Sequence, residues 1–196
     1  MFWLILAIGL WGVVHSIMAS LGFKALLQQT FGDRFMKFYR LLYNFFSVLS
    51  FAPILYLMIV LPNRDLYQVS PPWSYLMLAG QGISALMLLA AVLQTDVFHF
   101  VGLRQIVSDE KKGNLITSGL YRYVRHPLYT FGLLILWLSP SMTVNSLIVY
   151  ISLTIYILVG AYFEERKLLR EFGQAYAEYK NVTPMLIPGL KFGGNK

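Results

Sequence analysis

The side chains best suited to chemistry gather between Gly119 and Tyr129, where two arginines, a histidine and three tyrosines stand between long apolar runs. The chain has no cysteine, which excludes disulfides, thiolate metal sites and a cysteine nucleophile. Its three histidines, His15, His99 and His126, lie far apart and lack the spacing of a zinc site. No metal site is therefore predicted, and the chemistry must come from the other polar groups.

The composition identifies the surroundings of these residues. Hydrophobic residues make up 57% of the chain and charged residues 13%, and the mean hydropathy is +0.60, values typical of an integral membrane protein. A length of 196 residues leaves room for several membrane spans but hardly for a separate soluble catalytic domain. We therefore expect one membrane domain over residues 1–196, with its site built from loops and helix ends.

The apolar runs predict an all-α fold with five transmembrane helices. The expected spans cover about residues 2–21, 41–61, 73–94, 127–139 and 143–163. Residues 139–143 indicate a tight turn that makes the last two spans a helical hairpin. The apolar run from Leu128 to Leu138 is too short to cross the membrane alone. The fourth helix is therefore expected either to be tilted with polar ends or to begin near Tyr121.

The basic residues predict the orientation of these spans. The net charge is +7, and fifteen of the sixteen lysines and arginines fall on one side of the five-span scheme, with Arg64 as the exception. The positive-inside rule makes that side cytoplasmic, which places the N-terminus outside and the C-terminus in the cytoplasm. Topology and membrane lipid thus explain the basic total, and nucleic acid is not expected as a partner. Short loops and the absence of targeting segments favour a bacterial inner membrane.

Two longer segments on the cytoplasmic side, about 95–127 and 164–196, hold most of the remaining polar residues. A water-soluble ligand would bind there, in a cytoplasmic pocket. The second segment has a helical period at its start, and Gly173 is placed to end or kink that helix. Pro127 is suited to be the first residue of the fourth helix, which would put His126 at the helix entry.

The order of these motifs carries a resemblance to a known family. The quoted residues are Leu115-Ile116-Thr117-Ser118-Gly119-Leu120-Tyr121, then Arg125-His126-Pro127-Leu128-Tyr129, then an apolar hairpin, then Glu164-Glu165 with Phe172-Gly173, Tyr176, Tyr179 and Pro184. In this order they resemble the isoprenylcysteine carboxyl methyltransferase superfamily, whose members are integral membrane enzymes that use S-adenosylmethionine. Residues 15–20 and 96–105 are closer to its methanethiol S-methyltransferase and NnrU-like branch. Gly160 stands where the isoprenylcysteine enzymes have an arginine, which disfavours a prenylcysteine substrate.

The resemblance implies a cofactor site for S-adenosylmethionine, with S-adenosylhomocysteine as the product. The implied site residues are Gln105, Gly113, Asn114, Leu115, Ile116, Tyr121, Arg125, His126, Pro127, Leu128, Tyr129 and Glu164. Tyrosine rings could face the sulfonium or the adenine. We expect Arg125 to pair with the cofactor carboxylate and Glu164 with its ammonium or ribose.

The expected reaction is S-methylation of a small thiol, such as methanethiol, to a thioether such as dimethyl sulfide. A thiol must lose its proton, and His15, Asp96, His99 or His126 could accept it directly or through water. His15 has an equally simple structural interpretation, a hydrogen bond to a neighbouring helix. Two other functions stay open: methylation of a lipid-borne acceptor, namely an isoprenylcysteine carboxylate or a phospholipid amine, and a non-enzymatic NnrU-like membrane protein. No obligate protein partner is inferred.

Overall fold

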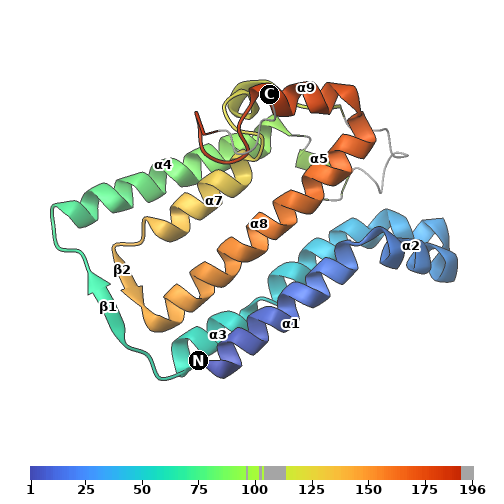
Figure 1. Ribbon diagram of the computed structural model, residues 1–196. Helices are drawn as coiled ribbons and strands as arrows, with labels where there is room; N and C mark the ends of the chain where they lie inside the picture. The colour runs from blue at the N-terminus through green and yellow to red at the C-terminus, as the bar shows by residue number, and fades with distance from the viewer. Residues whose placement is uncertain (96, 102, 104–113, 191–196) are drawn as a thin grey trace. The chain divides into compact units, whose positions relative to one another are not determined.

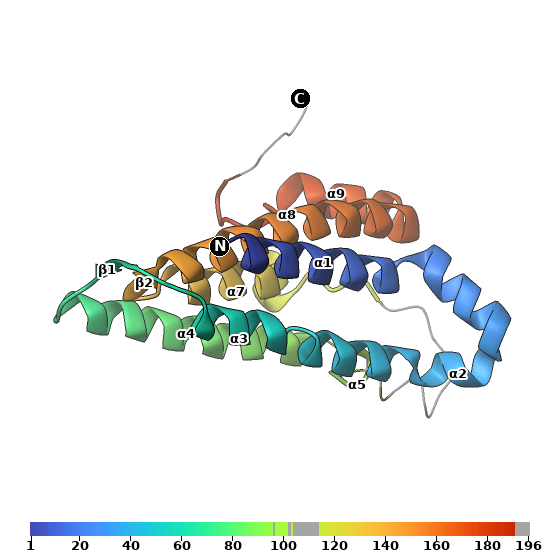
Figure 2. The same ribbon diagram turned by 90° about the horizontal axis from the view of Figure 1, so that it is seen from below.

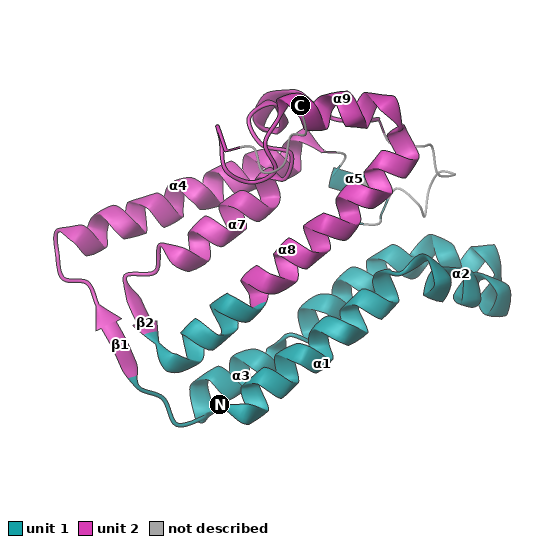
Figure 3. Cartoon of the chain, in the orientation of Figure 1, with its two compact units in different colours: residues 1–64, 96–112, 143–152 teal, residues 65–95, 113–142, 153–196 magenta. Residues whose placement is uncertain are grey.

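The computed structural model describes residues 1–95, 97–101, 103 and 114–190, and this part of the chain is mostly helical (Figure 1). The chain divides into two compact units (Figure 3). Unit 1 contains residues 1–64, 96–112 and 143–152, and unit 2 contains residues 65–95, 113–142 and 153–196. Each unit is described by itself.

Three helices make up most of unit 1. Helix α1 (Phe2–Ala19) packs along α2 (Leu21–Leu49) and α3 (Ala52–Val60) (Figures 1 and 2). The side chain of Ser20 caps α2 by accepting the backbone N–H of Phe23 at 3.2 Å. Gly32, at φ 75° and ψ 176°, interrupts α2, since this conformation is outside the helical range. With its start at Leu21, α2 begins well before the second span that the hydropathy predicts at about 41–61.

A short helix α5 (Val97–Val101) also belongs to unit 1. The side-chain amide of Asn44 on α2 donates to the backbone carbonyl of Val101 at 2.9 Å. This bond ties the end of α5 to the C-terminal part of α2.

Unit 2 is built on the pair α4 (Trp73–Gln94) and α7 (Pro127–Trp137), which lie side by side (Figures 1 and 2). The side chain of Gln81 donates to the backbone carbonyl of Ile135 at 2.7 Å. A Cβ atom on Gly80 would lie 2.9 Å from Cδ1 of Leu138, so the absence of a side chain permits this close packing. A polar bond and a small residue thus join the two helices.

Helix α7 begins at Pro127, as the sequence predicts, with His126 as its N-cap residue. The alternative start near Tyr121 is wrong, because Gly119–Arg122 forms a separate 3-10 turn, η1. At 1.5 Å per residue, the 11 residues of α7 rise only about 16 Å, roughly half the thickness of the hydrocarbon core. This helix is too short to cross the membrane along its normal.

The purely α-helical expectation needs one correction, because two short strands pair. Strands β1 (Asp65–Gln68) and β2 (Ser141–Thr143) form a two-stranded sheet. The sheet is extended by the bond from the N–H of Val69 to the carbonyl of Pro140 at 2.9 Å. The segment expected to be only a tight turn therefore also anchors the chain that precedes α4.

The last two helices meet at a sharp bend. Helix α8 (Val144–Phe172) ends at Gly173, whose φ of 55° lies in the left-handed region that favours glycine. Helix α9 (Gln174–Val182) then runs in a new direction (Figure 1). The predicted role of Gly173 as a helix breaker is confirmed.

Within the described residues, four stretches of helix are long and apolar enough to cross a membrane: Phe2–Ala19, Leu21–Val60, Trp73–Gln94 and Val144–Phe172. Large apolar side chains on these helices are exposed, for example Ile59 at 83% and Val48 at 78%. Apolar surface of this extent favours contact with lipid. The chain is thus a mostly helical protein with membrane-spanning character, and the fifth span stays a prediction.

Candidate functional site

The entry to α7 carries a buried guanidinium group. The side chain of Arg125 donates from Nε to Oε1 of Glu165 at 2.6 Å. One Nη atom also donates to the carbonyls of Lys180, at 3.2 Å, and Thr183. Each side chain of the ion pair is 7% exposed. A buried charge is tolerated only when it is paired and hydrogen-bonded. These contacts join the entry of α7 to α8 and to the end of α9.

Glu165 is the centre of a larger polar group, which we call the Glu165 cluster and which consists of Arg125, His126, Glu165, Tyr176 and Lys180. Oε1 of Glu165 also lies 3.2 Å from Nε2 of His126, and it accepts the hydroxyl of Tyr176 at 3.2 Å. The other oxygen, Oε2, is 3.1 Å from Nζ of Lys180. Two cations on one carboxylate keep Glu165 ionised in spite of its burial.

The neighbouring acid, Glu164, faces a different set of groups. The hydroxyl of Tyr129 donates to Oε2 of Glu164 at 2.7 Å, and Nδ1 of His126 lies 3.6 Å from the same oxygen. The rings of His126 and Tyr129 are stacked, with centroids 5.2 Å apart and planes 13° apart. The side chain of Glu164 is 43% exposed. The three residues, here called the Glu164 edge, thus combine a partly exposed carboxylate with a tyrosine ring that stacks on a buried imidazole.

Backbone bonds attach the segment after α9 to the start of α7. The N–H of Arg125 donates to the carbonyl of Pro184 at 2.9 Å, and the N–H of His126 donates to that of Met185 at 3.1 Å. The hydroxyl of Thr130 donates to the carbonyl of Leu186 at 2.8 Å. Residues 184–186 therefore satisfy groups at the entry of α7 that the helix itself leaves without partners.

Tyr121 lies on η1, close to the same carboxylates. Its backbone carbonyl accepts the hydroxyl of Tyr179. Burial, and after it the negative charge of Glu164, raises the pKa of the Tyr121 hydroxyl to about 12. Burial likewise raises the pKa of Tyr179 to about 12, although the charge of Arg125 opposes the shift. Both hydroxyls are neutral donors at any physiological pH.

His15, a candidate base for the thiol proton, lies in unit 1, on α1. Its Nε2 is 2.6 Å from the hydroxyl of Tyr43, and its Nδ1 is 3.0 Å from Oγ of Ser47. Ser47 Oγ also donates to the carbonyl of Tyr43 at 2.7 Å. The indole of Trp11 stacks on the His15 ring at a centroid distance of 4.9 Å. Both ring nitrogens thus have partners on α2, as the structural interpretation of His15 predicts.

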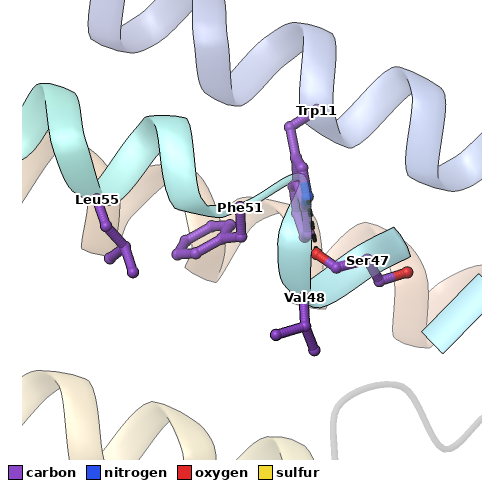
Figure 4. A pocket seen from close by; sticks show the side chains of 5 residues that line it. All are labelled: Trp11, Ser47, Val48, Phe51 and Leu55. Carbon is purple, nitrogen blue, oxygen red and sulfur yellow. Dashed lines mark hydrogen bonds between the residues drawn. The ribbon is translucent and has the colours of Figure 1, made fainter. Parts of the chain in front are cut away.

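A hollow of about 420 Å³ adjoins this group within unit 1 (Figure 4). It is lined by Trp11, Ser47, Val48, Phe51 and Leu55. The indole of Trp11 donates to the carbonyl of Ser47 at 3.4 Å, and its ring meets that of Phe51 edge to face at 5.1 Å. The lining is therefore apolar apart from one serine.

The remaining predicted site residues fall into two groups. Pro127 is fully buried at the start of α7 and Leu128 follows it on the same helix, whereas Asn114, Leu115 and Ile116 lie in irregular chain before η1. The others lie outside the described residues, in part or entirely: Asp96, Gln105, Gly113 and the side chain of His99.

The family model described as NnrU protein matches residues 3–190. The chain belongs to the NnrU family. No solved structure matches it.

Three relatives of this NnrU family chain are named methanethiol S-methyltransferases. Methanethiol S-methyltransferase 2 of Bradyrhizobium diazoefficiens is 31% identical over 195 residues, which cover 95% of this chain and 72% of the relative. Methanethiol S-methyltransferase 1 of the same organism is 30% identical over 94% of this chain and 65% of its own length. Methanethiol S-methyltransferase of Crocosphaera subtropica is 35% identical over 59% of this chain and 50% of its own length. The chain thus spans from half to about three quarters of these relatives.

Sequence reasoning assigned no role to three members of the Glu165 cluster, namely Glu165, Tyr176 and Lys180. It singled out Glu164 but left Glu165 without a role, and it named Tyr176 only as part of the motif. The available signal was the pair of adjacent acids: neighbouring helical residues point about 100° apart, so one faces the buried side while the other faces outward. Lys180 carried no comparable signal, because a lysine on a terminal helix is usually solvated.

Proposed function

We propose that this NnrU family chain is an integral membrane methyltransferase that transfers the methyl group of S-adenosylmethionine to a small thiol such as methanethiol. The observation that carries the proposal is the similarity, over 95% of this chain, to a relative named methanethiol S-methyltransferase. The Glu164 edge supplies the geometry, since it brings a carboxylate and two aromatic rings to one partly exposed place.

The residues of the Glu164 edge fit the cofactor chemically. S-Adenosylmethionine combines a sulfonium, an ammonium and a ribose, and it supplies an activated methyl group to an incoming nucleophile. A half-exposed carboxylate suits the ammonium or the ribose hydroxyls, because both are hydrogen-bond donors. The partly exposed ring of Tyr129, which stacks on the buried ring of His126, offers a π face to a sulfonium cation. We assign cofactor binding to Tyr121, His126, Tyr129 and Glu164.

Arg125 is better suited to holding the fold of the site than to binding the cofactor directly. Its Nε and one Nη are already bonded to Glu165 and to two backbone carbonyls. We infer that Arg125 keeps the segment after α9 against α7 and thereby holds the Glu164 edge in place. A role for Arg125 toward the cofactor carboxylate stays a prediction.

The chain's own contribution to the reaction is alignment and the exclusion of water. Methyl transfer needs little acid or base chemistry once the nucleophile, methyl group and leaving sulfur are in line. The thiol proton must still leave, and the base is one of the candidates named from the sequence. One of these candidates, His15, lies on α1 in unit 1. Its two ring nitrogens contact the hydroxyls of Tyr43 and Ser47.

The proposal includes the orientation in the membrane. The distribution of basic residues supports a cytoplasmic C-terminal segment and an external N-terminus by the positive-inside rule. A charged cofactor would then reach the Glu164 edge from the cytoplasm, and a volatile, lipid-soluble thiol could arrive through the bilayer. A bacterial inner membrane suits this arrangement.

A direct assay tests the proposal. Purified protein in lipid nanodiscs is incubated with S-adenosylmethionine labelled in its methyl group. Parallel reactions each contain one acceptor: methanethiol, a prenylcysteine analogue or phosphatidylethanolamine. We expect labelled dimethyl sulfide in the headspace and no transfer to the other acceptors. Glu164→Ala should abolish the signal, whereas Lys167→Ala, an exposed change on the same helix, should not.

Two results would count against the proposal. Transfer to the prenylcysteine analogue alone would exclude the thiol as substrate. No transfer to any acceptor, together with no heat of binding for millimolar S-adenosylhomocysteine in calorimetry, would exclude the methyltransferase itself.

A further inference from the structure

The two adjacent acids of α8 approach opposite nitrogens of one imidazole ring. Oε1 of Glu165 lies 3.2 Å from Nε2 of His126, and Oε2 of Glu164 lies 3.6 Å from Nδ1. The ring itself is buried, with 6% of the residue exposed. The protonation of the two nitrogens therefore decides what His126 presents toward the Glu164 edge.

The Glu165 side of the ring calls for a proton on Nε2. The carboxylate of Glu165 is ionised by the two cations beside it, Arg125 and Lys180, so it can only accept hydrogen bonds. A contact of 3.2 Å between this oxygen and Nε2 is a hydrogen bond only if Nε2 carries hydrogen. Glu165 thus selects the Nε2–H form.

The Glu164 side of the ring calls for a lone pair on Nδ1. A protonated Nδ1 facing a carboxylate would form a charge-assisted hydrogen bond of about 2.7–2.9 Å. The separation of 3.6 Å is beyond hydrogen-bond length, and Oε2 is instead engaged by the hydroxyl of Tyr129 at 2.7 Å. Nδ1 and Oε2 therefore form a pair of acceptors with no proton between them.

We propose that Glu165 is a positioning residue that fixes the tautomer of His126, so that Nδ1 and Glu164 together present two acceptors to a cationic N–H donor of the ligand. An ammonium group is a cationic N–H donor of this kind, and S-adenosylmethionine, the proposed cofactor, carries one. This inference rests on the proposed function for the identity of the ligand. The tautomer itself does not depend on it.

The substitution Glu165→Met removes the acceptor from Nε2 with little change in volume. Glutamine would not remove it, because its amide oxygen would stay where Arg125 Nε and the Tyr176 hydroxyl donate. In Glu165→Met, Glu164 is the carboxylate that remains beside the ring, which would move the ring proton to Nδ1 and turn an acceptor of the pair into a donor. Lys180→Met is the matched control, because Lys180 contacts Oε2, the oxygen that His126 does not touch. It removes a partner of Glu165 without changing the polarity at Nε2.

The experiment measures the tautomer directly by nitrogen NMR of protein labelled in its three histidines, with His126→Asn used to assign the signal. We expect an Nε2–H signal from His126 in the wild type and in Lys180→Met, and an Nδ1–H signal in Glu165→Met. Affinity for S-adenosylhomocysteine, measured by calorimetry, should fall at least about tenfold in Glu165→Met and stay within about threefold in Lys180→Met.

The possible failures are separable. A wild-type His126 that is protonated on Nδ1 or on both nitrogens at neutral pH overturns the inference, and this result needs no variant to fold. Equal affinity in the wild type and a folded Glu165→Met also overturns it. Absence of binding to the wild type, with the Nε2–H signal present, contradicts the proposed function and leaves the tautomer assignment standing.

Discussion

The side-chain amide of Gln94 occupies the space that a side chain on Gly119 would need: a Cβ atom there would lie 2.2 Å from Oε1 of Gln94. The same oxygen accepts the backbone N–H of Leu120 at 2.8 Å. Gly119 also has a φ of 62°, in the left-handed region. The end of α4 and the start of η1 are therefore joined at a point that only glycine fits.

Gly119→Ala should destabilise the protein by about 1–3 kcal/mol, because it adds a strained φ and displaces Gln94. The midpoint of thermal unfolding in detergent measures the effect. A double-mutant cycle separates the two causes: in a Gln94→Ala background the collision is gone and only the strain of φ remains. If Gly119→Ala costs the same in both backgrounds, the collision with Gln94 has no energetic weight.

Arg125→Met should lower the free energy of unfolding by about 3–5 kcal/mol, since it leaves the carboxylate of Glu165 buried with fewer partners. Arg125→Lys should recover only part of the loss, because an ammonium cannot reproduce the fork that contacts Glu165 and two carbonyls at once. Unfolding midpoints report the order of the three proteins. Arg122→Ala, at an exposed neighbouring position, serves as the control and should leave the midpoint unchanged.

Tyr129→Phe should weaken binding of S-adenosylhomocysteine by about three- to tenfold. The stacked ring is kept, but Glu164 loses the hydroxyl that orients it, a contribution of about 1 kcal/mol. Calorimetry gives the affinity. Tyr123→Phe removes the same hydroxyl from a ring that is 63% exposed and should bind as the wild type does. Identical losses in both variants would argue against the Glu164 edge as the cofactor site.

Alkaline pH should destabilise the protein through its buried tyrosines. The pKa of Tyr121 and that of Tyr179 are raised from 10 to about 12 in the folded state, by burial first. The unfolded chain therefore loses these protons at lower pH, so the stability they contribute is complete below pH 10 and is lost as the pH rises to 12. Unfolding midpoints between pH 9 and 12 test this, and Tyr121→Phe should flatten the fall. An unchanged slope in Tyr121→Phe would remove Tyr121 as a cause.

Local sequence signals predicted the boundaries of several elements. Proline has a fixed φ that suits the first turn of a helix, and Pro127 starts α7. Glycine adopts a positive φ without strain, and Gly173 follows the last residue of α8. Both effects are local and do not depend on what packs around the residue. The pairing of β1 with β2 was not predictable in this way. Asp65–Gln68 is short and polar and lies between prolines, and its partner strand is more than seventy residues away in the sequence.

The second helix and the site show the same limit. Hydropathy marked the apolar part of α2 but not its polar beginning, which is helical from Leu21 because of the Ser20 cap. Motif order correctly gathered residues of the Glu164 edge. It could not assign opposite faces to Glu164 and Glu165, because that depends on the rotation of α8 against α7 and α9.

The attachment of Pro184 and Met185 to the start of α7 has a consequence for biosynthesis. The ribosome completes Arg125 and His126 long before it reaches their backbone partners. During that interval the amides at the entry of α7 must be satisfied by water or by the insertion machinery. The entry of α7 thus reaches its final hydrogen bonding only after α8 and α9 have been synthesised.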